Sequence, residues 1–320
     1  MSEGVADNPR VANSVPMPTI WRTKLRSLKP GVDHQEQVDH NFDDGIVGIG
    51  WGIEGLPDGA TLDDVLAAID AEPDWTKDAV HTVRRFGEAA QIGDYIWTRD
   101  LHGRFRLGRI TGPYRYENTE LAKRTDTHQV RDCEWADQPL SDLEVPGAVI
   151  RGFVGTSTSF SRMWDEGART YTAWLWEKLQ GRDPAPLSFT HLEVLRQLEP
   201  YDLEDLVYTW MQVAEDYLAL PKARRTDTPA YEWTMLNRKT FMPAIVQVKS
   251  GDQAVDLEAL AAAAPDAETV LFACSASGQF KGNPPREVRC VYPDALVAFV
   301  REHERLLPPR VRTWFELAAG

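Results

Sequence analysis

The chain has 320 residues, 42% of them hydrophobic and 26% charged, which is the balance of an ordinary globular protein with room for two domains. A formal net charge of −14 argues against indiscriminate coating of nucleic acid, although binding at one site depends on local charge. No apolar run approaches the ~20 residues that span a bilayer, and three scattered cysteines fit neither a disulfide framework nor a zinc site, so we expect a cytoplasmic protein with no membrane partner.

The first part of the chain combines an irregular segment with a short strand and helices. Residues 1–35 contain serine, asparagine and proline without apolar periodicity, and we expect a flexible arm there. The run 45–52 is β-like but broken by glycines. Residues 61–69 then predict a helix capped by Thr61, and 78–86 continue as a helix.

Short strand-like runs separated by turn residues follow. Gly103, Gly112 and Pro146 are among the residues that punctuate them. Short alternating strands with such turns predict a small, mostly closed β-barrel with helices on its flank. The runs are 94–98, 105–111, 128–135 and 148–150.

This region resembles an EVE-like domain of the PUA superfamily, over about residues 40–163. The segments that carry the resemblance are 48–51, 92–97, 107–116 and 128–135. It implies a recognition domain, residues 36–163, that holds a flipped, modified base in an aromatic pocket, where stacking restores what extrusion costs. Core packing is the alternative for each aromatic residue. The implied base-binding and phosphate-binding residues are Trp51, Trp97, Tyr114, Tyr116, Trp135, Arg109 and Arg115.

A connecting segment, residues 164–190, separates this region from the rest. Helix-like apolar spacing over 161–179 includes Tyr171, Trp174 and Trp176, and we expect these aromatics to be buried against a neighbour. The proline-containing stretch 181–186 then ends the helix.

The most informative stretch is the apolar run that ends in Gln247-Val-Lys249. Together with 231–236 it flanks a short polar connection, which predicts a β-hairpin. Residues two apart in a strand share a face, so Gln247 and Lys249 point the same way, with Glu232 of the other strand nearby. A carboxylate, an amide and a lysine at one sheet end suit a divalent cation and a water nucleophile, with Mg²⁺ expected and Mn²⁺ as the alternative.

Residues 202–212, Glu232 and 247–249 together resemble the Mrr-like branch of the PD-(D/E)xK nucleases, in which glutamine replaces the usual acid of the final motif. The resemblance covers about residues 196–300, with 269–273 and 288–293 as later strands. It implies a nuclease domain, residues 191–320, with a restriction-endonuclease-like mixed α/β core.

By this resemblance, Glu232 is the metal-binding acid, Gln247 its helper and Lys249 the base that orients water. Glu204 and the carbonyl of Val248 complete the metal site. Asp227 is the alternative first acid, although it lies in a turn-like stretch. A solvated lysine at a sheet edge is the structural alternative for Lys249, and an acid at a helix start needs no catalytic role.

We therefore expect a two-domain protein of the α+β or α/β class, with the small barrel recognising and the mixed core cutting. The expected activity is that of a type IV-like, modification-dependent restriction endonuclease, a magnesium-dependent hydrolase acting on double-stranded DNA with modified bases, in defence against foreign or phage DNA. Because one site cuts one strand, we expect a homodimer on DNA. The alternatives are an RNA-acting nuclease effector, a catalytically inactive nucleic-acid sensor and a barrel that binds a small metabolite.

Overall fold

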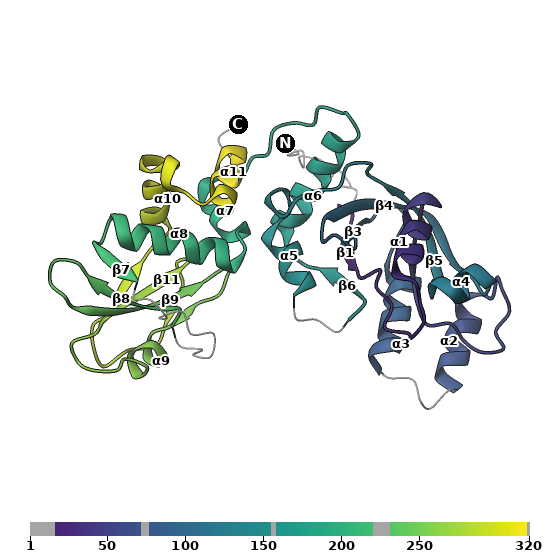
Figure 1. The fold of residues 1–320 in the computed structure, drawn as a ribbon, viewed down its shortest axis with the longest axis horizontal. Helices are drawn as coiled ribbons and strands as arrows, with labels where there is room; N and C mark the ends of the chain where they lie inside the picture. Colours follow the sequence, from purple (N-terminus) through teal and green to yellow (C-terminus); the bar gives the residue numbers. More distant parts are fainter. Residues whose placement is uncertain (1–16, 72–76, 155–157, 220–230, 319–320) are drawn as a thin grey trace, which may run out of the picture.

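The computed structural model describes residues 17–71, 77–154, 158–219 and 231–318. Its mixed α+β fold has two lobes, each built around its own large sheet, with helices α5, α6, α7 and α11 between the sheets (Figure 1). None of the described helices is long and apolar enough to cross a membrane.

The first lobe contains a six-stranded sheet in the order β2-β5-β4-β3-β1-β6. Strands β1 and β3 are parallel, and the other neighbours are antiparallel. The strands are β1 (Ile20–Thr23), β2 (Ile46–Ile49), β3 (Tyr95–Arg99), β4 (Phe105–Tyr116), β5 (Gln129–Trp135) and β6 (Phe160–Met163).

Strand β1 corrects the expectation of a flexible arm over residues 1–35. It is buried along its whole length and lies between β3 and β6, and Asp94 ties it down by accepting from the Trp21 indole N–H at 2.8 Å. The described part of that segment, from residue 17, therefore belongs to the sheet, whereas residues 1–16 lie outside the described residues.

Helices flank this sheet. In α2, Asp64 N–H donates to the Thr61 hydroxyl at 3.2 Å, as expected of the predicted cap. Residues 148–150, expected as a strand, lie instead in α5, which begins at Gly147 directly after Pro146 as its N-cap residue. The flanking elements are α1 (His34–Asp43), α2 (Leu62–Ala71), α3 (Lys77–Arg84), the π-helical turn η1 (Arg85–Ala89), α4 (Glu120–Thr125), η2 (Asp142–Glu144) and α5 (Gly147–Phe153).

Helix α6 (Glu166–Leu179) begins later than the apolar spacing suggested, because residues 160–163 pair with β1 as strand β6. Asp165 caps the helix by accepting from Ala168 N–H at 2.7 Å. Tyr171 and Trp176 are buried, as expected of a connecting helix that packs against a neighbour, whereas Trp174 is only partly buried.

The second lobe contains a five-stranded sheet in the order β13-β11-β9-β8-β7. Strands β7, β8 and β9 form an antiparallel meander, and β9, β11 and β13 are parallel. The elements are α7 (His191–Gln197), α8 (Pro200–Val213), β7 (Tyr217–Ala219), β8 (Trp233–Asn237), β9 (Pro243–Lys249), β10 (Val255–Asp256), α9 (Leu257–Ala262), β11 (Val270–Ser275), β12 (Phe280–Lys281), β13 (Arg289–Val291), α10 (Pro293–Glu302), η3 (Glu304–Leu306) and α11 (Pro309–Ala318).

Each face of this second sheet is covered by helices. Val246 and Val248 belong to the core that includes buried residues of α8, α10 and α11. Ile245 instead packs in a smaller cluster with Leu260 of α9. Gln247 and Lys249 share the face of Ile245, so they lie on the side of the sheet opposite α8.

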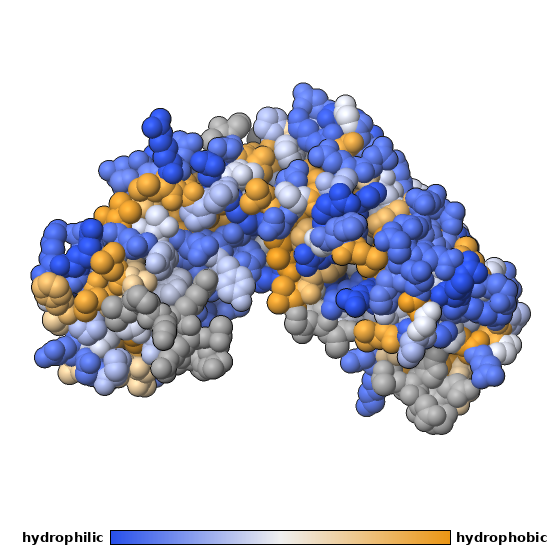
Figure 2. Space-filling view, viewed as in Figure 1, coloured by the Kyte–Doolittle hydropathy of each residue, from blue (hydrophilic) through white to orange (hydrophobic). Residues whose placement is uncertain are grey.

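The two lobes share one hydrophobic core, which includes Trp97 and Trp176 from the first part of the chain and Val194 and Trp314 from the second. The rings of Tyr171 on α6 and Trp314 on α11 lie 4.7 Å apart between centroids. Figure 2 shows a largely hydrophilic face on which apolar residues gather near α5 and over the α8–α10 layer.

Candidate functional site

The predicted hairpin is present and brings two of the predicted site residues into contact. Strands β8 and β9 pair with Trp233 opposite Val246, and Glu232 N–H donates to the Val246 carbonyl at 2.7 Å. Across the same pair, the amide nitrogen of Gln247 donates to Glu232, with an Nε2–Oε1 distance of 3.1 Å. This bond fixes the orientation of the Gln247 amide.

Lys249 ends strand β9, on the same face as Gln247. Its carbonyl accepts from Ala276 N–H at 2.9 Å, and its side chain is half-buried. The register places Glu232 opposite Gln247, so Lys249 lies two residues further, about 6–7 Å along the strand. The sheet therefore presents a carboxylate, a buried amide and a lysine in a row along one edge.

The Val248 carbonyl points toward strand β8, which begins directly after Glu232. The Val246 carbonyl points to β8, and carbonyls two residues apart point the same way. Among the residues that the structure describes, no group of three His, Cys, Asp or Glu side chains converges as a metal site. A cation here would rely on Glu232 together with amide and carbonyl oxygens, which are hard ligands of the kind that Mg²⁺ takes.

Glu204 lies on helix α8, which covers the opposite face of the sheet. One turn later, the Tyr208 ring packs edge-on against Trp233 at 5.8 Å between centroids. This contact places α8 next to the start of β8. Glu204 is thus on the opposite side of the sheet from Gln247 and Lys249, and Asp227 falls outside the described residues.

Asp202, two residues earlier on α8, forms a buried ion pair with Arg310 of α11, with an Oδ2–Nε distance of 2.5 Å. Burial raises the pKa of Asp202 to about 6, and the Arg310 charge opposes this only in part. Arg310 also donates to the Val145 carbonyl of the first lobe. This acid therefore joins α8 to α11 and is not part of the candidate site.

In the first lobe, three of the predicted base-binding aromatics are core residues. The Trp97 indole N–H donates to the Thr172 hydroxyl at 3.1 Å, and that of Trp135 donates to the Ile46 carbonyl at 2.8 Å. The Tyr116 hydroxyl accepts from Ile53 N–H at 2.8 Å. All three are buried, which fits the core-packing alternative for each of them.

The other residues predicted from β4 are also engaged within the lobe. The Tyr114 hydroxyl donates to Gln129 at 2.5 Å, Arg115 pairs with Glu117 and Asp132, and Arg109 donates to the Gly93 carbonyl at 3.3 Å. Strand β4 has neighbours on both sides, so its residues support the sheet.

Trp51 is the predicted aromatic residue that does line a cavity, of about 370 Å³, on the surface of this lobe. Its backbone is left-handed, with φ 66°, which costs a side-chain-bearing residue on the order of 1–2 kcal/mol. Such strain is concentrated at functional sites. The cavity is lined by Lys24, Arg26, Ser27, Leu28, Lys29, Gln37, Ile49, Gly50, Trp51, Gly52, Asp126 and Ser159.

The electrostatics of this cavity differ from those of the whole chain. Lys24, Arg26 and Lys29 line it against a single carboxylate, that of Asp126, although the protein carries a net charge of −14. Asp126 accepts from the Ser27 hydroxyl at 2.6 Å and, like Trp51, has a left-handed backbone. The arrangement can attract an anion and stack an aromatic ring beside it.

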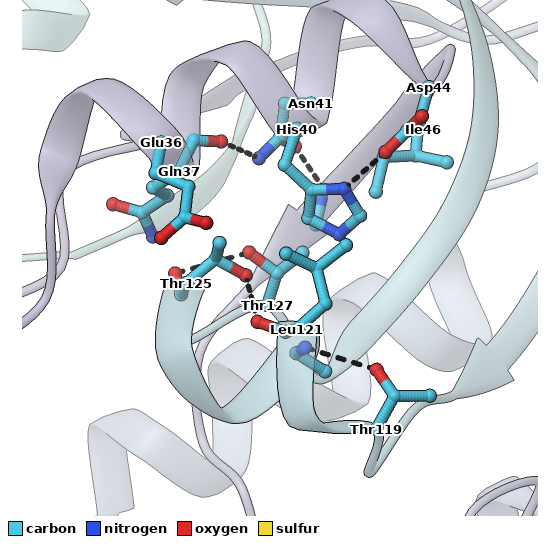
Figure 3. Close-up of polar contacts among 12 residues, drawn as sticks. Glu36, Gln37, His40, Asn41, Asp44, Ile46, Thr119, Leu121, Thr125 and Thr127 are labelled. Atoms are coloured by element: carbon cyan, nitrogen blue, oxygen red, sulfur yellow. Dashed lines mark hydrogen bonds and ion pairs between the residues drawn. The ribbon is translucent and has the colours of Figure 1, made fainter.

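Figure 3 shows polar contacts of helices α1 and α4, and α1 contributes Gln37 to the lining of the cavity. The Asn41 amide donates to the Gln37 carbonyl at 2.8 Å, and its oxygen accepts from Gly48 N–H at 2.7 Å. The side-chain oxygen of Gln37 in turn accepts from Ser27 N–H at 3.0 Å. On α4, the Thr125 hydroxyl donates to the Leu121 carbonyl at 2.8 Å, immediately before Asp126 ends the helix.

The sequence interpretation missed the cationic wall because it lies in the segment taken for an arm. The signal was present: four basic residues follow the apolar Ile20–Trp21 pair at short spacing, and three of them, Lys24, Arg26 and Lys29, line the cavity. Asp126 gave no comparable signal, since a lone aspartate after a short helix is an ordinary helix end.

A larger cavity of about 570 Å³ lies between the lobes. Its walls come from α5, the start of α6, α7 and the turn at 250–253 that follows Lys249. Two basic side chains face four acidic ones, so this cavity does not favour a phosphate. These residues are Arg151, Arg196, Asp165, Glu166, Glu193 and Asp252.

Comparisons with known proteins add little about activity. The family model described as Domain of unknown function (DUF8426) matches residues 24–148. No curated protein matches the chain. Among solved structures, the chain is similar to the YTH domain of Zygosaccharomyces rouxii MRB1 protein in complex with N6-methyladenosine RNA, at 13% identity over 55% of this chain and 96% of that one. The TM-score of 0.25 does not establish a shared fold.

Proposed function

We propose that the protein is a modification-dependent endonuclease, in which the first lobe binds a modified base and the second cuts a phosphodiester. The observation that carries the cutting half is the Gln247–Glu232 hydrogen bond of 3.1 Å, beside Lys249 at the end of β9. The mixed five-stranded sheet supports the nuclease-like core that the sequence resemblance implies, and the six-stranded sheet with its flanking helices supports a recognition domain of the PUA kind.

The donor set at this edge suits a hard cation. Glu232 would hold Mg²⁺, or Mn²⁺ as the alternative, with the Gln247 amide oxygen and the Val248 carbonyl as further ligands. Glu204 lies on the helix that covers the opposite face of the sheet, so it is not included in this ligand set. When bound, the ion would supply Lewis-acid stabilisation of the phosphate and lower the pKa of a coordinated water. Lys249 orients the attacking water and stabilises the negative charge that develops on the phosphate.

The cavity around Trp51 supports the recognition half. An extruded base can stack on the Trp51 indole, which offsets part of the cost of leaving the duplex. Lys24, Arg26 and Lys29 supply the local positive charge that phosphates require, so the net charge of −14 is no obstacle. In this proposal the modified base binds in the cavity around Trp51, and Trp97 and the other core aromatics do not contact it.

One cutting edge cleaves one strand. Double-strand cleavage therefore needs two protomers, and we expect a homodimer assembled on DNA. Gel filtration with and without a modified duplex measures this directly, and a 1:1 complex that still cuts both strands would contradict it.

The experiment that tests the proposal compares cleavage of matched duplexes that are unmodified, methylated, hydroxymethylated or glucosylated, in Mg²⁺. Lys249→Ala and Trp51→Ala run beside the wild type. We expect cutting of one modified duplex, lost in Lys249→Ala and weakened in Trp51→Ala. Cutting of every duplex would retain the nuclease and refute modification dependence. Degradation of structured RNA alone would move the activity to RNA.

A second function, an inactive nucleic-acid sensor, is favoured by one observation: no three-acid cluster is present in the described part of the chain. Titration calorimetry with Mg²⁺ separates the two. Measurable binding that is lost in Glu232→Gln supports the nuclease, whereas no binding together with intact recognition of a modified duplex supports the sensor.

A further inference from the structure

Ser27 is anchored more completely than its place in a surface loop requires. Its N–H donates to Gln37 at 3.0 Å and its hydroxyl donates to Asp126 at 2.6 Å. The same hydroxyl accepts from Lys29 N–H at 3.0 Å, and the Ser27 carbonyl lies 2.9 Å from Nε2 of His34. Every polar group of this serine therefore has a partner, and the loop is fixed at this point.

The residue that follows, Leu28, has an apolar side chain that is exposed to solvent. Leu28 lines the Trp51 cavity and is 94% exposed, although Leu25 of the same segment is buried. A single exposed leucine is ordinary on a protein surface, so its surroundings carry the argument. Here the side chain projects from an anchored backbone, at a cavity wall, between the basic residues Arg26 and Lys29.

We propose that Leu28 is a wedge, which enters the base stack of duplex DNA at the position vacated by the base bound in the Trp51 cavity. The inference rests on the proposed function and names its partner as a duplex. Apolar side chains that insert between base pairs offset unstacking, and flanking cations hold the phosphates on either side. Ser27 acts through Leu28, as a positioning residue.

The wedge has a consequence that a plain binding contact lacks. Removing Leu28 should weaken binding only where the base must first leave a stack. A base that is already unpaired has no gap to fill, because its extrusion is complete before binding. The effect of the variant must therefore depend on the state of the nucleic acid.

The test measures binding of full-length wild type and Leu28→Ala to two ligands that carry the same modified base. One is a fully paired duplex, and the other is a single strand. Leu306→Ala is the control, since Leu306 is exposed by 53% on the second lobe. For Leu28→Ala we expect about a tenfold loss of affinity for the duplex and less than about a twofold change for the single strand. The reason is that Leu28 fills a gap in the base stack only when the base has left a duplex. Ser27→Ala should show the same pattern more weakly.

Fluorescence of 2-aminopurine placed next to the modified base reports extrusion directly, and Leu28→Ala should reduce the increase on binding. Equal losses on both ligands, or none on either, would overturn the wedge while leaving the base pocket intact. A wild type that binds the single strand but not the duplex would do the same. A wild type that binds neither would refute the proposed recognition itself, and the wedge with it.

Discussion

Trp51 and Asp126 face the same cavity, and both hold the left-handed backbone that side-chain-bearing residues rarely adopt, with φ 66° and 49°. Gly50 lies between them, and a Cβ added there would meet the Asp126 carboxylate at 2.5 Å. Two strained residues and a glycine without room for a side chain thus shape one wall.

Trp51 offers a matched pair of substitutions that separates strain from stacking. Trp51→Ala and Trp51→Gly both remove the indole, so both should lose binding of a modified base to the same extent. Glycine accepts a positive φ without cost, so Trp51→Gly should be more stable than Trp51→Ala by about 1 kcal/mol. Fluorescence anisotropy and denaturant unfolding measure the two effects. A glycine variant that is the less stable one would contradict the role of strain.

Trp97 should behave as a core residue. It is fully buried between β3 and α6, and Trp97→Ala should lower the free energy of unfolding by about 3–5 kcal/mol. Trp97→Phe keeps most of the buried volume and should cost less, while leaving base binding unchanged. Unfolding curves check the first effect and anisotropy the second. Loss of binding in a stably folded Trp97→Phe would return this residue to the base-binding site.

Gln247→Glu should make the stability of the protein depend on Mg²⁺. The new carboxylate would lie about 3 Å from Glu232, and two such charges repel each other unless a cation or a proton separates them. Thermal unfolding in EDTA should occur several degrees below the wild type, with recovery in Mg²⁺.

The control for this prediction is Gln247→Met, which adds neither charge nor ligand and should respond to Mg²⁺ no more than the wild type does. Identical midpoints of Gln247→Glu in EDTA and Mg²⁺ would show that no cation binds at this edge.

The buried acid Asp202 predicts a pH dependence of stability. Its pKa is raised from 3.8 to about 6 by burial, so the folded state binds more protons than the unfolded chain. The contribution of this group to stability is therefore fully present below about pH 4 and is lost as the pH rises through about 6. Asp202→Asn stays neutral at every pH, and its stability relative to the wild type should rise by about 2 kcal/mol between about pH 4 and pH 7.

Denaturant unfolding at several pH values measures this difference, with the exposed Asp294→Asn on α10 as the control. A difference between Asp202→Asn and the wild type that stays constant with pH would mean that Arg310 balances the cost of burial.

Local patterns predicted the elements whose signals are local. The β8–β9 hairpin follows from alternation around a polar turn, and α2 follows from its cap and apolar spacing. Strand β1 escaped because all four of its residues are buried, which leaves no alternation, and because its partners lie about 75 and 140 residues further along the chain. The segment 148–150 is too short for the helical and the strand periodicity to be distinguished.

The candidate sites divide in the same way. Glu232 and Gln247 could be paired from the sequence because one turn sets their register. Trp51 and Trp97 could not be separated, because a tryptophan has the same identity in a cavity and in a core, and only the neighbours supplied by distant segments decide between them. The cationic wall depends on a loop whose position is set by Gln37 and Asp126, from two different helices.

The packing of Tyr171 on Trp314 helps to fix the distance between the two lobes. Lobes joined by a flexible tether would let the cutting edge sample many phosphates around a bound base, and the cuts would scatter. Under the proposed function, the core shared by the two lobes would hold the cutting edge at a fixed distance from the bound base, so strand breaks should fall at one set spacing from the modified base.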